Sequence, residues 1–173
     1  MNKTKKLLLC ALLLAATIVL GRILSIRTSI ITIGFAFVPI MLSAIILGTK
    51  YSVFIATVSD IIGALLFPTG SYFFGFTITS FLTGLVYGLI LYRKEFKFDK
   101  NFIIRLTISV VIVTGLLNGC LNTIWIIMIN KGASNVVIPI RILKQLVMAP
   151  VEIVTISSLC KIFEERIKKL VND

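Results

Sequence analysis

The sequence is organised around Phe67-Pro68-Thr69-Gly70-Ser71-Tyr72-Phe73-Phe74-Gly75-Phe76-Thr77, a stretch that separates two long apolar runs. Pro68 and Gly70 predict a turn. The stretch also carries five aromatic side chains and no charge, although turns in water are normally polar. We therefore expect the turn to fold over a flat ligand, or to lie at the lipid interface as part of an aromatic belt.

The composition is that of an integral membrane protein. Of the 173 residues, 58% are hydrophobic, and the mean hydropathy is +1.06. The apolar residues form long runs rather than short stripes, so we expect one membrane domain over residues 1–173. Cys10, Cys120 and Cys160 fit no metal-binding spacing and are expected to be small buried apolar side chains.

Six apolar runs predict an all-α fold with six transmembrane helices. The expected spans are residues 5–24, 33–47, 51–66, 77–92, 102–129 and 137–163. The first run follows a short basic segment and resembles a signal peptide, but no soluble domain follows it, so we expect it to be retained. Pro150 predicts a kink in the last span.

The net charge of +11 is explained by membrane orientation rather than by nucleic acid binding, because the cations cluster beside the ends of the apolar runs. Six spans place both termini on one side. If that side is the cytoplasm, 13 of the 18 Lys and Arg residues lie inside. The positive-inside rule therefore favours an N-in, C-in topology. The aromatic turn then faces outward, together with residues 21–32 and 130–136.

Polar side chains at membrane depth are costly, so each of them requires an explanation. Asp60 lies in the third span, where it could also serve a structural ion pair or a hydrogen bond between helices. In the fifth span, Asn118, Asn122 and Trp125 follow an i, i+4, i+7 spacing, so two amides and an aromatic ring share one helix face.

In the sixth span, Arg141, Lys144, Met148 and Glu152 also fall on one stripe, with the cations toward the outer end and Glu152 deeper. The outer half of the protein thus offers cations, amides, a carboxylate and aromatic rings. These groups suit a planar heteroaromatic ligand that also carries negative charge.

Enzymatic activity is not expected. The chain has no histidine and no GxxxxGK[ST] motif, so common hydrolase and metalloprotease constellations and a phosphate-binding P-loop are missing. We expect no cofactor and no metal. The chain is also small for a secondary transporter built from large inverted repeats. If the protein transports a solute, the energy should come from another subunit.

The outer ends of the spans carry motifs that can be compared with known families. They are Arg22-x4-Arg27 with Gly34-Phe35-x-Phe37-x-Pro39, Asp60-Ile-Ile-Gly63-Ala-Leu-Leu-Phe67-Pro68-Thr69-Gly70-x-Tyr72-Phe73-x-Gly75-Phe76-Thr77, Leu121-Asn122-Thr123-x-Trp125, and Arg141-x2-Lys144-x5-Pro150-x-Glu152. Over essentially the whole chain, the sequence resembles the folate-specific S-components of energy-coupling-factor (ECF) vitamin transporters. Phe74 departs from the family pattern, where Pro is more usual, which loosens the turn without changing the expected ligand.

The resemblance implies a six-helix S-component that binds one vitamin from outside, in the plasma membrane of a bacterium. It implies docking on one transmembrane coupling (T) protein and two ATPase subunits, which hydrolyse the ATP, and reorientation of the whole S-component to release the vitamin inside. The candidate substrate-binding residues are Arg22, Arg27, Phe37, Asp60, Phe67, Pro68, Tyr72, Phe73, Gly75, Phe76, Asn118, Asn122, Trp125, Arg141 and Lys144.

Among these candidates, Trp125 is expected to stack on the ligand, and Asp60 and Asn122 are expected to read its ring. The cations are expected to hold the glutamate tail of folate. Alternative interpretations are an S-component for another vitamin, such as pantothenate or riboflavin, or a membrane scaffold outside transport whose polar residues are structural.

Ala11 and Ala15 form a candidate docking site for the partner subunits. They lie four residues apart, so they share one helix face, and small side chains let another helix approach closely in lipid. The resemblance strengthens this interpretation, because S-components of this group carry a small-xxx-small pair on the first helix.

Overall fold

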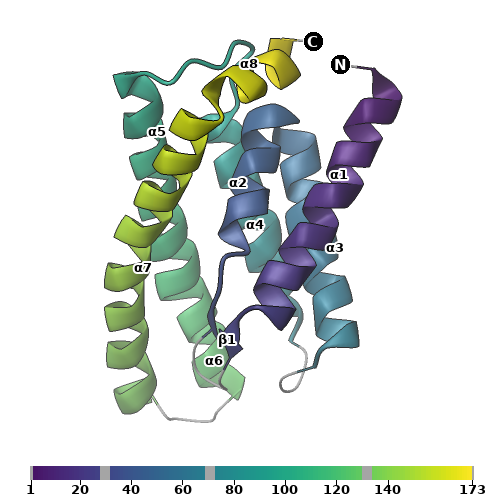
Figure 1. The fold of residues 1–173 in the computed structure, drawn as a ribbon. Helices are drawn as coiled ribbons and strands as arrows, with labels where there is room; N and C mark the ends of the chain where they lie inside the picture. The colour runs from purple at the N-terminus through teal and green to yellow at the C-terminus, as the bar shows by residue number, and fades with distance from the viewer. Residues whose placement is uncertain (1, 28–31, 69–72, 130–133, 173) are drawn as a thin grey trace.

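The computed structural model describes residues 2–27, 32–68, 73–129 and 134–172, and almost all of them are helical (Figure 1). The first half contains α1 (Lys3–Ile18), the π-helix η1 (Val19–Ile23), β1 (Ile26–Arg27), β2 (Thr32–Ile33), α2 (Phe37–Ile46) and α3 (Thr49–Leu66). The second half contains α4 (Phe74–Leu91), α5 (Lys100–Val111), the π-helix η2 (Ile112–Leu121), α6 (Asn122–Ile129), α7 (Ser134–Ile162) and α8 (Glu164–Asn172).

Five segments in the described part of the chain are long and apolar enough to cross a membrane: Lys3–Ile23, Thr49–Leu66, Phe74–Leu91, Lys100–Ile129 and Ile138–Ile162. The sixth, α2, has ten residues, which is about 15 Å of helix at 1.5 Å per residue. It contacts α1, α3, α4, α7 and α8 and so occupies the middle of the bundle (Figure 1). The protein is therefore an all-α, multi-pass membrane protein.

Each of the six expected spans begins two to four residues away from the start of its helix, and two of these differences bear on the candidate site. The second span was expected from residue 33, but α2 begins at Phe37, because Thr32 pairs with Arg27 and Ile33 with Ile26 in a short antiparallel ladder. The fourth span was expected from residue 77, but α4 begins at Phe74. The second half of the aromatic stretch therefore forms the first turn of a helix.

Helices α3 and α4 make the most extensive contact between described elements, and glycines allow it. A Cβ added to Gly84 would lie 2.7 Å from the Ser52 carbonyl oxygen, and one added to Gly88 would lie 2.5 Å from Thr49 Cα. The four-residue spacing of these glycines places both on one face of α4, so the two backbones approach closely, as they do in small-xxx-small contacts within membranes.

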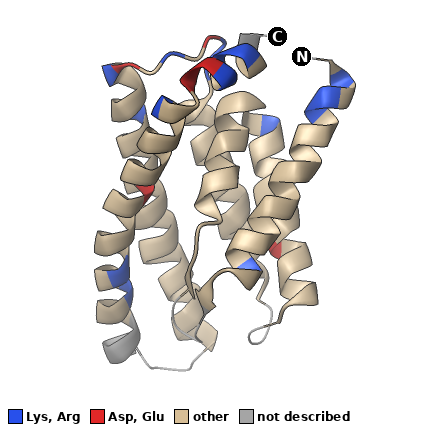
Figure 2. Cartoon of the chain, in the orientation of Figure 1, with Lys and Arg blue, Asp and Glu red and all other residues tan. Residues whose placement is uncertain are grey.

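The charge distribution matches an N-in, C-in orientation. Figure 2 shows Lys, Arg, Asp and Glu gathered mainly at the end of the bundle that holds both termini. Long apolar side chains cover the flanks of the helices, with Leu65 73% exposed and Leu146 68% exposed. Exposed leucine on this scale is expected where the surrounding solvent is lipid.

The end that holds both termini is closed by α8 and by the segment between α4 and α5. Ile167 of α8 is buried, and the rings of Phe96 and Phe102 meet edge to face at 5.3 Å between centroids. The Phe98 backbone N–H donates to Glu164 Oε1 over 3.3 Å and so joins the segment to α8. These contacts complete an apolar core that includes Met41, Leu106, Val110, Ile156 and Cys160.

The prediction for the cysteines is correct at two positions and wrong at one. Cys10 and Cys160 are buried, whereas Cys120 is exposed. Cys120 lies in η2, whose buried residues are Val113, Thr114 and Leu117, and it is not on the face that they share. Helix α7 continues through both Pro139 and Pro150 as one 29-residue helix.

Candidate functional site

Arg22 lies in η1, which continues α1, and forms an ion pair with Asp60 of α3. Its Nη2 donates to Asp60 Oδ1 over 3.0 Å and to the Asp60 carbonyl oxygen over 3.2 Å. The hydroxyl of Thr77 on α4 donates to Asp60 Oδ2 over 2.8 Å. One carboxylate therefore holds together three segments at the end of the bundle remote from the termini.

The π-helical turn of η1 and a glycine in α3 shape this junction. The Leu24 N–H donates to the Val19 carbonyl oxygen over 2.8 Å, five residues back, which widens the turn that carries Arg22. A side chain at Gly63 would overlap the Arg22 guanidinium. The structural interpretation of Asp60 as one half of an ion pair is thus observed, and both of its oxygens retain capacity to accept a further hydrogen bond.

An aromatic corner, formed by Phe73, Phe76 and Trp125, lies where α4 meets α6. Phe73 and Trp125 are tilted at 47° with centroids 5.5 Å apart, and Phe73 meets Phe76 edge to face at 6.2 Å. Trp125 Nε1 donates to Thr79 Oγ1 over 3.2 Å. A Cβ on Gly75 would lie 2.6 Å from Phe73 Cε1 and 2.7 Å from Trp125 Cδ2, so the corner depends on a residue without a side chain.

Arg141 of α7 holds η2 and α6 from the other side of the bundle. It is 6% exposed, and it donates from Nε to Thr123 Oγ1 over 2.9 Å and from Nη2 to the Asn118 carbonyl oxygen over 3.0 Å. Asn122 Nδ2 donates to Asn118 Oδ1 over 2.9 Å. Asn118 and Asn122, which were expected to share a helix face, therefore contact each other. The Arg141 guanidinium binds the backbone carbonyl of Asn118.

A second polar layer lies deeper in the bundle. The Tyr87 hydroxyl of α4 donates to Glu152 Oε2 of α7 over 3.1 Å, and both side chains are buried. The buried stripe of α7 runs through Arg141, Gln145, Met148 and Glu152, whereas Lys144 is only half-buried at its edge. Sequence reasoning missed Gln145 and Tyr87. The i+4 spacing from Arg141 would have found Gln145.

Other candidates lie outside these clusters. Phe37 is buried at the start of α2, with its ring centroid 5.9 Å from that of Phe35. Phe67 and Pro68 are exposed at the end of α3. The backbone of Arg27 forms part of β1, but its side chain, like the whole of Tyr72, lies outside what the structure describes.

The two candidate docking residues are on the outer surface of α1. Ala11 and Ala15 are exposed, whereas the buried residues of this helix are Cys10, Leu13 and Thr17. The alanine face therefore points away from the bundle.

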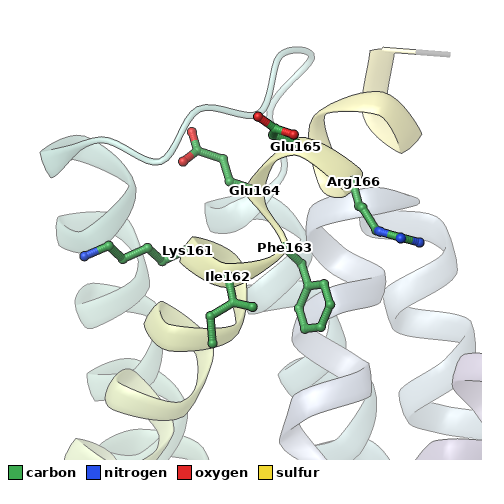
Figure 3. A pocket seen from close by; sticks show the side chains of 6 residues that line it. All are labelled: Lys161, Ile162, Phe163, Glu164, Glu165 and Arg166. Carbon is green, nitrogen blue, oxygen red and sulfur yellow. The ribbon is translucent and has the colours of Figure 1, made fainter.

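A hollow lies at the α7–α8 junction (Figure 3). It has a volume of about 460 Å³ and is lined by Lys161, Ile162, Phe163, Glu164, Glu165 and Arg166. Lys161 is 20 residues from Arg141 along α7, which is about 30 Å of helix. We therefore treat the hollow at the α7–α8 junction as separate from the candidate site.

The fold and these clusters define a class: small helical membrane proteins that carry a polar and aromatic site at one end of the bundle. Comparison with known proteins makes the class specific. Residues 1–164 match the model of the family described as "ECF-type riboflavin transporter, S component". The chain belongs to this family of ECF transporter S-components.

Relatives of known specificity carry the comparison further. The folate transporter FolT of Clostridium novyi (strain NT) is 34% identical over 156 residues, which cover 90% of this chain and 88% of that protein. The folate transporter FolT of Leuconostoc mesenteroides subsp. mesenteroides is 34% identical over 155 residues, covering 87% and 81%. A crystal structure of FolT bound with folic acid superposes with a TM-score of 0.77 at 29% identity, over 89% of this chain and 90% of that one.

Proposed function

We propose that this protein is the folate-binding S-component of an ECF importer. The observation that carries the proposal is the match to FolT bound with folic acid over about nine-tenths of both chains. The polar and aromatic clusters support it, because they converge at the end of the bundle away from the termini. Folate supplies a planar pterin for the rings and amides, and a glutamate tail for the cations.

The residue roles follow from the chemistry of each group. Trp125 stacks on the pterin beside Phe73, and Asn122 and Asp60 read polar atoms of the ring. The cations at the outer ends of the spans supply positive charge for the carboxylates of the tail. Arg22 acts by holding Asp60 in place, since its guanidinium already pairs with that carboxylate. Gly75 leaves the space that the rings of Phe73 and Trp125 occupy.

The remaining candidates keep the roles that their chemistry suggests. We expect the cation of Arg27 and the rings of Phe37, Phe67, Tyr72 and Phe76 to contribute to folate binding, and Asn118 and Pro68 to position their neighbours.

Transport requires partners, because neither a P-loop nor a hydrolytic constellation occurs in this sequence. The S-component sits in a bacterial plasma membrane and docks on a T protein with two ATPase subunits, which hydrolyse the ATP. Ala11 and Ala15 form the docking face on α1, where two exposed small side chains allow another helix to approach.

Riboflavin is the second candidate, because the matching family model is described by that vitamin. Riboflavin offers a flat ring but no carboxylate, so it brings no anionic group to the cations at the outer end of the bundle. The charged groups of the site therefore favour folate.

Mass spectrometry of the ligand released from purified protein tests the choice. We expect the mass of a folate, and a competition assay in which folate displaces bound ligand and riboflavin does not. Release of riboflavin, or displacement by riboflavin alone, would overturn the proposal.

A further inference from the structure

Two buried amide atoms in the polar clusters are without a hydrogen bond. In the described part of the chain, Asn122 Oδ1 and Gln145 Nε2 are the buried side-chain polar atoms that find no partner. Gln145 is 8% exposed. Most buried polar groups in folded proteins are paired, since an unpaired one loses its hydrogen bonds to water without replacement. A donor and an acceptor that are both left unpaired require an explanation.

Both amides are connected to the contacts made by Arg141. Gln145 is one turn further along α7 on the same buried stripe. Asn122 lies between Asn118 and Thr123, the two residues that accept hydrogen bonds from Arg141. The unpaired donor therefore lies on α7 and the unpaired acceptor on α6, and these two helices are in contact.

The aromatic corner continues from this region. Trp125 follows Asn122 by three residues, so the two side chains lie on one side of α6. Trp125 is already fixed by Phe73 and by its hydrogen bond to Thr79. A ring that stacks on Trp125 thus presents its edge to amide groups, while its face meets the indole.

We propose that Gln145 is a specificity-determining residue, which donates from Nε2 to a ring carbonyl while Asn122 Oδ1 accepts from the adjacent ring N–H. The inference rests on the proposed folate function, because the pterin of folate carries such an edge: the 4-oxo group beside N3–H. The edge of a 4-amino folate analogue has the opposite polarity, with an amino donor beside a ring nitrogen that accepts. Gln145 and Asn122 together select the oxo form.

Two variants of Gln145 test the proposal through binding and stability together. Gln145→Met keeps the volume but removes the unpaired donor. We expect it to weaken folate binding by about tenfold, the loss of one neutral hydrogen bond, and to leave the thermal midpoint of the ligand-free protein unchanged or higher. Leu146→Met is the matched control, since Leu146 is the lipid-facing neighbour on α7, and it should change neither quantity.

Gln145→Glu tests the choice between the two ligands, because a purely structural role of Gln145 would change the affinities for both ligands equally. Its carboxylate accepts where the amide donates, and Arg141 and Lys144 nearby supply compensating charge. The ratio of the Kd for folate to the Kd for its 4-amino analogue should rise by at least about tenfold relative to the wild-type protein. An unchanged ratio would overturn the proposal, even if both affinities fall.

The outcomes separate this inference from the function on which it rests. If the wild-type protein binds folate and Gln145→Met binds it equally well, the role of Gln145 is refuted and the folate function stands. If Gln145→Met lowers the thermal midpoint and weakens both ligands alike, Gln145 is structural and the proposal fails. If the wild-type protein binds no folate, the proposed function and this inference fail together.

Discussion

Arg22 and Asp60, 38 residues apart in the sequence, are joined by a 3.0 Å contact from Nη2 to Oδ1 that fixes the end of α1 and η1 to the middle of α3. Gly63 makes this contact possible, because a side chain there would overlap the guanidinium. Thr77 adds α4 to the same carboxylate. The ion pair is thus a property of three packed segments rather than of two side chains alone.

Gly63→Ala should displace Arg22 from Asp60. We expect the free energy of unfolding to fall by about 1–3 kcal/mol, as for other insertions into packed regions, and folate binding to weaken as well. Thermal unfolding in detergent measures the first effect. Gly115→Ala is the control, because a Cβ at Gly115 meets no atom within 4 Å. Equal behaviour of the two variants would show that the space beside Arg22 is not needed.

Trp125→Ala should weaken folate binding by about ten- to a hundredfold, since stacking on an aromatic side chain contributes about 1–3 kcal/mol per ring. Trp125→Phe keeps an aromatic ring and loses only the hydrogen bond to Thr79, so it should retain most of the affinity. Isothermal titration together with an unfolding curve separates the two roles. Loss of folding in step with binding would favour a structural role for the indole.

Tyr87→Phe should destabilise the protein by about 1–3 kcal/mol, because it leaves the buried Glu152 carboxylate without the hydroxyl that donates to it. Replacing both partners, by Tyr87→Phe with Glu152→Leu, should cost less than the sum of the single changes. A double-mutant cycle of unfolding free energies measures the coupling. Strict additivity would mean that the 3.1 Å contact contributes nothing.

Ala11→Trp combined with Ala15→Trp should keep folate binding near normal and abolish uptake with the ATPase module. Both positions are exposed on α1, and a bulky side chain blocks close approach of a partner helix. Leu143→Trp, on the lipid-facing side of α7, is the control and should retain uptake. Normal uptake by the double variant would refute docking through this face, and loss of binding would place the alanines inside an internal contact.

Asp99 caps α5 outside the membrane. The Phe102 N–H that donates to its carboxylate, and then the cation of Arg93, lower the pKa of Asp99 below its usual 3.8. A lowered pKa means that the charged form stabilises the fold above the unfolded-state pKa, and that this contribution is lost as the pH falls through the folded value. Asp99→Asn should therefore flatten the decline of stability below about pH 4. If the unfolding free energy of Asp99→Asn falls with decreasing pH as steeply as that of the wild-type protein, Asp99 does not contribute to acid sensitivity.

The sequence predicted the helical membrane architecture because long apolar runs leave little choice of structure in lipid. The start of α2 could not be found this way, since Ile33 is apolar enough to extend a span and becomes part of a strand only by pairing with Ile26 of β1. The start of α4 was missed for a related reason. Phe74 and Gly75 were assigned to the aromatic turn, but they form the first turn of the helix.

The sequence indicated candidate residues for the site, whose role stays a prediction, but it did not show how these residues pair. The i, i+4 relation of Asn118 and Asn122 was visible in the sequence, and the two amides are in contact. The partner of Glu152 was not visible, because Tyr87 is 65 residues away on another helix. Gln145 was missed because the stripe on α7 was traced through Lys144, which lies at the edge of the buried face.

The packed core near the termini has an electrical consequence. Met41, Ala44, Leu106, Val110 and Ile156 are each 0% exposed. The buried hydroxyls among them, Ser43, Ser52 and Ser109, donate to backbone carbonyl oxygens of their own bundle. A proton wire needs a continuous chain of hydrogen-bonding groups or water, and this layer offers apolar side chains and hydroxyls already committed to the backbone. We therefore expect this layer of described residues to act as an insulator, so that a cell can keep many copies in its membrane without a leak that drains its ion gradients.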